Sequence, residues 1–244
     1  MFHFNCLLMK TLRYFSLILL LALALPGALR AAGREVRTVG AFTKVGLSNS
    51  ARVVLRQGSP QKVEVEASAA DLARIETTVE NGKLRIHTKR ENGLNWSNAR
   101  FDGPVTVYVT MPTVNELSVS GSGRLEAETA VQATALELAI SGSGSITLAK
   151  LAADKLNSAV SGSGNITVAG TCPQHEARIS GSGDVRASEL RTETSAVRIS
   201  GSGNGRVYAA RTLDASIAGS GNVYVRGGAS VSSKVSGSGR VRQE

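Results

Sequence analysis

The chain has 244 residues, a formal net charge of +9 and 42% hydrophobic residues, which is the composition of a globular protein with one large domain or two small ones. Aromatic residues make up only 4% and 26 residues are glycine, so a core of Val, Ile, Leu and Ala in thin, regular layers is favoured over a bulky sandwich. The basic residues are dispersed and no recognised binding motif accompanies them, which excludes nucleic acid as an expected partner.

Residues 1–32 are predicted to be a cleaved signal peptide. Lys10 and Arg13 precede an apolar run, Tyr14–Leu25, and small residues follow it up to Gly33. The run is well short of the roughly 20 residues that span a bilayer as a helix. An uncleaved anchor is the alternative. The prediction is export to the periplasm or the outer cell surface, without a membrane span after processing.

The exported part is basic and has a single cysteine. Processing removes three basic residues and no acidic ones, which leaves 25 basic against 19 acidic residues, a net charge of +6. Such a protein is attracted to anionic polymers or headgroups by long-range electrostatics. Cys172 has no intramolecular disulfide partner and is expected to be a buried small residue.

Residues 33–118 are predicted to be a β region that forms irregular first coils or a small β-sheet cap. Alternating apolar and polar residues occur in four stretches, 42–55, 63–67, 74–88 and 105–111. Asn81-Gly82 lies between two of these runs and is a strong signal for a tight hairpin turn. No segment of the exported part predicts a helix.

Residues 91–103 interrupt this strand pattern. They contain Trp96, the only tryptophan, and Phe101. Aromatic residues on a loop of a rigid body are candidates for contact with a sugar or a partner. The alternative interpretation is that both rings plug the end or the side of the fold.

Residues 119–244 contain an internal repeat. Gly-Ser-Gly occurs seven times, at spacings of 21, 20, 19, 20, 18 and 18 residues. A β-branched residue stands two places before every first glycine, and an apolar residue stands two places after the last glycine in six of the seven copies. Period-two alternation on both sides of a glycine turn is typical of half-buried strands.

Repeats of about 20 residues bury their apolar faces by stacking on one another. Because the residue type at each position is nearly constant, like-on-like stacking is favoured over a meander of antiparallel hairpins. The sequence therefore predicts an all-β protein, a parallel β-helix or solenoid with coils of about 20 residues.

On the strand before each turn, two positions are expected to face outward. Equivalent residues at each position on successive coils then form a column. The first contains Glu116 and Glu137 on neighbouring coils, about 4.8 Å apart. A divalent ion bridging them, or an acid pair for a glycosidase, is one hypothesis. The other is a solvated face, on which Glu176 is offset by Arg178 and Arg198.

Other chemistry is not expected. Strands rather than helices follow the glycine motifs, which argues against a nucleotide site. One carboxylate in seven turns cannot build a calcium ladder. The exported part has two histidines and no paired-cysteine spacing, so no metal and no cofactor is expected.

The repeat resembles that of a bacterial family, the head GIN domain, described as an auto-transporter adhesin. Five exact Ser-Gly-Ser-Gly copies begin at Ser120, Ser141, Ser161, Ser180 and Ser200, a sixth begins at Ser236, and Ala218 replaces the first serine once. Phe42 to Gly58 is also similar to the first strand pattern of the family. The resemblance covers residues 36–242. It implies an exported right-handed β-helix-like domain of the bacterial envelope, and no catalytic residues.

The functional prediction is a non-catalytic binding or structural module of the cell envelope. Its expected partner is an anionic envelope polysaccharide or another envelope protein. The alternative is a polysaccharide-active enzyme that uses Glu116 and Glu137. Because Arg240, Arg242 and Glu244 are charged residues suited to blocking an open strand edge, a monomer or small homo-oligomer is expected.

Overall fold

The computed structural model describes residues 33–89 and 101–244. The predicted signal peptide and Trp96 lie outside these ranges. Residues 32–244 form one compact unit. Within the described ranges, no helix has the length and apolar character needed to cross a membrane.

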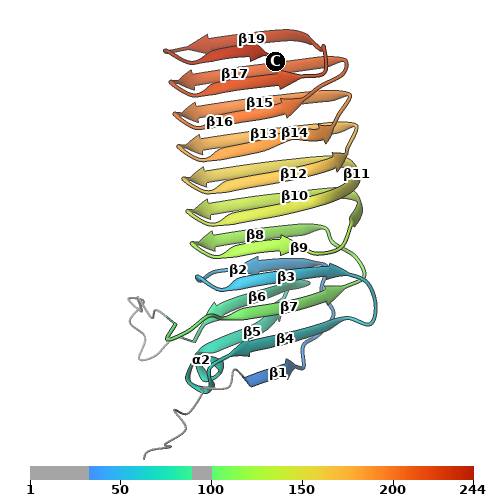
Figure 1. The fold of residues 1–244 in the computed structure, drawn as a ribbon, viewed down its shortest axis with the longest axis vertical. Helices are drawn as coiled ribbons and strands as arrows, with labels where there is room; N and C mark the ends of the chain where they lie inside the picture. The colour runs from blue at the N-terminus through green and yellow to red at the C-terminus, as the bar shows by residue number, and fades with distance from the viewer. Residues whose placement is uncertain (1–32, 90–100) are drawn as a thin grey trace, which may run out of the picture. The chain divides into compact units, whose positions relative to one another are not determined.

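Strands of one sheet, called sheet A here, precede the glycine corners and pair in parallel, coil on coil (Figure 1). They are β8 (Glu116–Gly121), β10 (Val131–Gly142), the second part of β11 (Ser145–Gly162), β13 (Gln174–Gly181), β15 (Thr194–Gly201), β17 (Thr212–Gly219) and β19 (Ser230–Ser236).

Strands of the opposite sheet, sheet B, follow the corners and also pair in parallel. They are β9 (Arg124–Ala127), the first part of β11, β12 (Asn165–Thr171), β14 (Asp184–Arg191), β16 (Asn204–Tyr208), β18 (Asn222–Arg226) and β20 (Arg240–Gln243). The predicted solenoid with coils of about 20 residues is confirmed, and the hairpin meander is excluded for this region.

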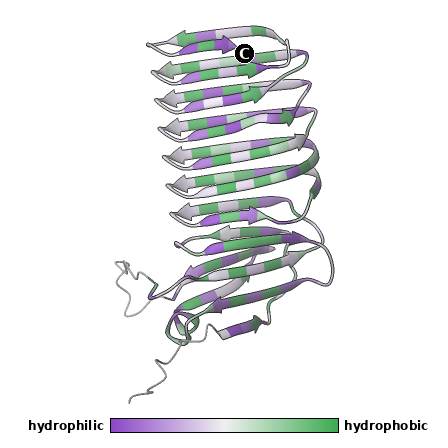
Figure 2. Cartoon of the chain, in the orientation of Figure 1, coloured by the Kyte–Doolittle hydropathy of each residue, from purple (hydrophilic) through white to green (hydrophobic). Residues whose placement is uncertain are grey.

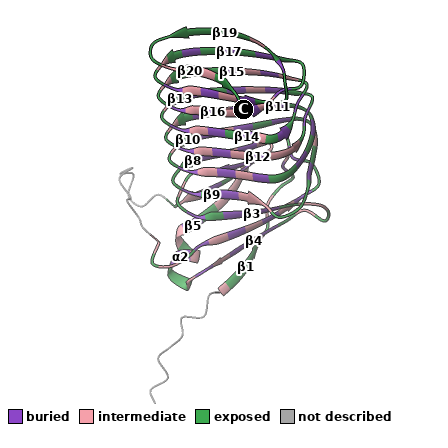
Figure 3. Cartoon of the chain, turned by 45° about the horizontal axis from the view of Figure 1, so that its top comes forward, coloured by how far each residue is buried: buried purple, intermediate pink, exposed green. Residues whose placement is uncertain are grey.

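The core lies between the two sheets and follows the period-two pattern. Along each strand, apolar and polar residues alternate (Figure 2), and buried and exposed residues alternate with them (Figure 3). In β15, for example, Val197 and Ile199 are buried, whereas Arg198 is exposed. Because stacked coils place like residues on one another, the β-branched residues before the corners form a continuous inward column.

The corners require glycine because each rests on the corner before it. Gly201 has a φ of 127°, and a Cβ built on it would lie 2.4 Å from the carbonyl oxygen of Gly181. A Cβ on Gly203 would lie 2.2 Å from the carbonyl oxygen of Gly183. Both the backbone conformation and the stacking distance therefore exclude side chains here.

A further coil precedes the repeat in the sequence and lacks the motif. It consists of β2 (Lys44–Leu47) in sheet A and β3 (Arg52–Gln57) in sheet B, which pair in parallel with β8 and β9. Its corner, residues 48–51, reads Ser-Asn-Ser-Ala. On its other side lie two strands that the segment 89–105 joins, a connection much longer than the four-residue corners.

Those strands are β6 (Lys83–Thr88), which pairs in parallel with β2, and β7 (Thr106–Met111), which pairs in parallel with β3. Antiparallel strands then close this end of the stack: β5 (Ile75–Glu80) on β6, β4 (Lys62–Ala67) on β7, and β1 (Gly33–Arg37) on β4. The sequence left open irregular first coils or a cap, and the structure has a cap together with coils that pair in regular parallel register.

The predicted hairpin turn at Asn81-Gly82 is confirmed. It joins β5 to β6, and its two residues have φ values of 51° and 70°. Both values lie in the left-handed region that a two-residue turn of this kind requires.

The expectation that no helix occurs is wrong at one place. The helix α2 (Ala69–Arg74) has the N-cap residue Ser68, whose Oγ accepts a hydrogen bond from the Asp71 N–H and donates one to the Asp71 carboxylate. Asp71 is fully buried and also accepts hydrogen bonds from the N–H groups of Asp102 and Gly103, at 3.1 and 3.2 Å. It thereby ties the segment before β7 to the helix.

Candidate functional site

The outer face of sheet A is the candidate site, and three columns of side chains cover it. The strand register aligns each column residue with its counterpart on the next coil. The first column contains Glu116, Glu137, Asn157, Glu176, Ala196, Asp214 and Ser232. The middle column contains Ser118, Ala139, Ala159, Arg178, Arg198, Ser216 and Lys234. The third contains the first serines of the corner motifs, with Ala218 in place of one of them.

A groove of about 680 Å³ runs across the coils on this face. Its floor consists of the small residues Ser118, Ala139 and Ala159, and the serine column lines one side. Lys83 lies at one end, and Arg178 and Arg198 lie at the other. Neighbouring strands are about 4.8 Å apart, so the floor from Ser118 to Arg178 extends about 14 Å.

The cationic end at Lys83 comes from the cap. A Cβ on Gly46 would lie 2.7 Å from the Lys83 Cε, so the lysine side chain crosses β2 where that strand has no side chain. Its Nζ lies 2.5 Å from a carboxylate oxygen of Glu116, and the Nζ of Lys44 lies 3.9 Å from the other oxygen. Two cations thus share one carboxylate.

The opposite end has the same charge arrangement. Arg178 and Arg198 both pair with the Glu176 carboxylate, and the Arg178 contact is 2.7 Å. The arginines are about half exposed, so these pairs contribute little to stability, roughly 0–1 kcal/mol each. Each end of the groove therefore has two cations that share one carboxylate, and Glu137 lies beside Glu116 in the same column.

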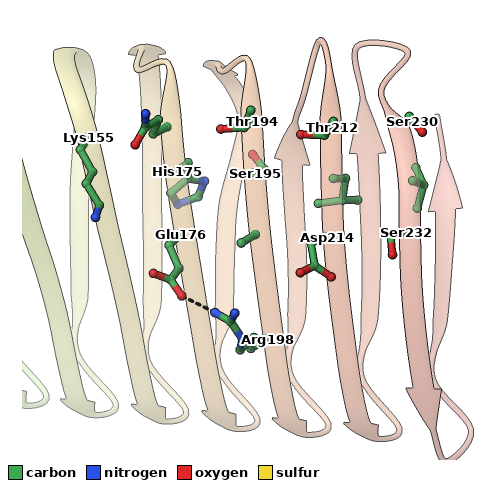
Figure 4. A pocket seen from close by; sticks show the side chains of 14 residues that line it. Lys155, His175, Glu176, Thr194, Ser195, Arg198, Thr212, Asp214, Ser230 and Ser232 are labelled. Carbon is green, nitrogen blue, oxygen red and sulfur yellow. Dashed lines mark hydrogen bonds and ion pairs between the residues drawn. The ribbon is translucent and has the colours of Figure 1, made fainter.

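A second cleft of about 520 Å³ meets the groove at Arg198 and continues over β13, β15, β17 and β19. Lys155, Thr194, Thr212, Asp214 and Ser232 line it, and Figure 4 shows these side chains along the strands, with Glu176 directed to Arg198. A third cleft, of about 440 Å³, shares Lys83 with the groove. The three depressions follow one another along sheet A.

Buried polar groups lie beneath the second cleft. His175 faces the core with its Nε2 3.1 Å from the Ser158 Oγ, while its Nδ1 has no hydrogen-bond partner in the described part of the chain. Burial lowers the pKa of His175 to about 4. The ring is therefore neutral at ordinary pH and replaces an apolar residue, since Leu156 and Leu213 occupy the same inward column.

The outer face of sheet B differs from this surface. Long side chains cross it from coil to coil, such as Arg52 to Glu126 at 2.7 Å and Arg56 to Glu128 at 2.6 Å. Asp184 accepts hydrogen bonds from the backbone N–H and the side-chain amide of Asn204, whose own Oδ1 accepts one from Asn222. The Asn and Asp residues after the corners therefore form a ladder between coils.

The structure places the predicted site residues as follows. Glu116 and Glu137 are neighbours in register, and Glu116 is held by two lysines of the preceding strands. Phe101 is half-buried and packs against the core, and Trp96 lies outside the described residues. The sequence did not indicate Lys44 and Lys83, because neither belongs to the repeat.

Cys172 is a core residue, as the sequence indicated. Cys172 is fully buried, its Sγ lies 3.1 Å from the carbonyl oxygen of Gln174, and burial raises the pKa of its thiol. Among the described residues, no cluster of three or more His, Cys, Asp or Glu side chains is placed to hold a metal ion.

Solved structures of similar fold come from Bacteroides fragilis, Parabacteroides distasonis and Parabacteroides merdae. A protein named as a putative adhesin, from Bacteroides fragilis, has a TM-score of 0.79 at 20% identity and covers 88% of this chain and 98% of its own. One named as a putative lipid binding protein, from Parabacteroides distasonis, has a TM-score of 0.71 at 22% identity, with 88% and 97% covered. A putative adhesin from Parabacteroides merdae has a TM-score of 0.69 at 18% identity, with 88% and 96% covered. These likenesses establish the shared fold.

The family comparison is more direct. A search of curated proteins finds no match. The model of one family, described as "Putative auto-transporter adhesin, head GIN domain", matches residues 41–229, which include the coil of β2 and β3 as well as most of the repeat. The chain belongs to the head GIN domain family.

Proposed function

We propose that the chain is an exported, non-catalytic binding module of the cell envelope, and that the outer face of sheet A is its contact surface. The observation that carries the proposal is the groove across the coils, with a floor of small residues and two cations at each end. Family membership supports the adhesin-like role, and the signal-peptide pattern of residues 1–32 supports export.

The ligand that fits this surface best is an acidic polysaccharide chain. A linear polymer can lie along the groove across several coils, and the row of serine hydroxyls beside it offers repeated hydrogen-bond donors and acceptors. The cations at the ends attract its carboxylates. A solved relative is named as a lipid-binding protein, so anionic vesicles are the comparison ligand in the test.

The test compares two faces of the same protein. Ala139→Glu with Ala159→Glu places two carboxylates on the groove floor, and Thr147→Glu with Thr167→Glu places the same charges on sheet B. We expect the first variant to bind polygalacturonate at least about tenfold more weakly than the wild type in calorimetry. The sheet B variant is expected to bind as the wild type does. Equal losses in both variants, or stronger binding to anionic vesicles than to polygalacturonate, would contradict the proposal.

Catalysis is measured on the same samples. Glu116 and Glu137 are adjacent on the proposed binding face, so a polysaccharide-active enzyme remains the alternative function. New reducing ends or unsaturated products from polygalacturonate, lost in Glu137→Gln, would support that alternative. An unchanged polymer after prolonged incubation is the result expected for a binding module.

A further inference from the structure

At the C-terminal end of the stack, β19 in sheet A and β20 in sheet B each have one unpaired edge within the described residues, and β19 is the longer of the two. Each strand of sheet A from β6 to β17 pairs with a neighbour on both sides, but within residues 33–89 and 101–244 β19 pairs only with β17. Its side chains are exposed along nearly the whole strand (Figure 3). Val235 is 41% exposed, whereas Ile217 at the same position one coil earlier is 1% exposed.

The unpaired edge presents a defined set of hydrogen-bonding groups. The N–H of Ser230 donates to the carbonyl oxygen of Arg211, so the even-numbered residues of β19 direct their backbone groups to β17. The N–H and C=O groups of Val231, Ser233 and Val235 therefore face outward from the stack. Unpaired groups of this kind are a template for another strand.

Two copies of β19 that run in opposite directions can pair with compatible side chains opposite each other. In an antiparallel pair centred on Ser233, Val231 lies opposite Val235 of the second copy, and Ser233 lies opposite Ser233 of the second copy. These are the residues whose backbone groups face the edge, so all of their N–H and C=O groups find partners. The pairs of valines, which face the interior, cover each other.

Other registers are less favourable. Centring the pair on Lys234 places the two Lys234 ammonium groups directly opposite each other, which is destabilising. The register centred on Ser233 places Lys234 opposite Ser232 of the second copy instead. The edges at the opposite end of the stack, β5 and β1, present Glu76, Glu80 and Glu35, and neither repeats the valine spacing of β19.

We propose that two copies of this chain associate through β19 as a closed dimer, with antiparallel strands about a two-fold axis at Ser233. Such a contact joins sheet A of one copy to sheet A of the other and uses the β19 edge of both copies, so this two-fold contact closes on itself and does not propagate into a fibre. The proposal is independent of the ligand assigned to the groove.

Sedimentation of the unit from residue 32 to residue 244 tests the oligomeric state. Between about 5 and about 500 μM, we expect the mass to rise to that of two copies and to stop there. Val235→Lys removes an apolar contact and adds a charge at the interface, and is expected to give one-copy mass at concentrations where the wild type is dimeric. Val36→Lys is the matched control, because Val36 is 58% exposed on β1 at the other end, and it is expected to remain dimeric.

Disulfide cross-linking tests the register. Ser233→Cys places two thiols opposite each other across the axis, within the Cα separation that a disulfide accepts. Ser216→Cys is the control, on the outer face of β17. Cys172 is buried and gives no background. Strong dimer formation by the first variant alone supports the proposal. One-copy mass throughout, growth beyond two copies, equal effects of the two lysine substitutions, or equal cross-linking of the two cysteine variants would overturn it.

Discussion

In the coils from β8 to β20, every corner rests on the corner before it, whereas the coil of β2 and β3 rests on strands joined by residues 89–105. The first arrangement leaves no room for a Cβ, so glycine recurs at each corner. The second permits Asn49 and Ala51 at the positions on which Gly121 and Gly123 stack. Glycine is therefore needed where a corner stacks on a preceding corner, and a coil can form without it where no such corner precedes.

The largest effect is expected at a stacked corner. Gly201→Ala combines a left-handed φ, which costs roughly 1–3 kcal/mol, with a backbone clash, which costs a similar amount. Asn49→Ala, in the corner that lacks glycine, loses one hydrogen bond to the Ala51 N–H, worth about 1 kcal/mol. Urea unfolding midpoints measure both. Similar losses in the two variants would refute the distinction between stacked and unstacked corners.

Acidification is expected to weaken the core of the coils at His175. Its pKa in the folded protein is about 4, below the unfolded value of 6.5, so the unfolded chain takes up the proton first as pH falls. The contribution of the neutral ring to the free energy of unfolding is complete above about pH 6.5. It falls by about 3 kcal/mol as the pH is lowered towards 4. The double variant Ser158→Ala, His175→Leu removes both hydrogen-bonding partners and should lose this part of the pH dependence, measured by thermal melting. An identical pH profile in both proteins would argue against burial of a neutral imidazole.

A smaller and local effect is expected in the cap at Asp71. Asp71→Ala leaves the N–H groups of Asp102 and Gly103 without their acceptor and should cost about 2 kcal/mol. Because the contact joins α2 only to the segment before β7, amide hydrogen exchange should accelerate in the cap while β10 to β18 keep their protection. Faster exchange throughout the coils would show that the cap and the coils unfold as one unit.

Much of the coil region was predictable from local patterns. The columns that begin at Glu116 and Ser118 are in the register that the spacing of the motif indicated, because a period-two pattern anchored by glycine leaves one way to bury the valines and isoleucines. The hairpin at Asn81-Gly82 was equally local. The Ser68–Asp71 pair is a capping signature that could have revealed α2, although so short a helix has little apolar periodicity.

The candidate groove was only half predictable. Arg178 and Arg198 follow from the repeat, but Lys83 reaches the same face because β6 lies beside β2, and β2 lies beside β8. The chain forms β2 and β3, leaves to build the cap, and returns through β6 and β7 on the far side of that coil. No spacing in the sequence encodes this order of strands.

By itself, the sequence determined the elements whose cause is local: alternating strands, glycine corners, and the stacking of equivalent residues. Tertiary structure alone decided which strands flank the coil of β2 and β3, how the cap closes one end, and which lysines join the face of sheet A. The physical reason is that repeated units have the same residue types at equivalent positions, so each coil packs best on another coil of the same pattern. Unlike strands specify their neighbours only through long-range packing, which local patterns do not record.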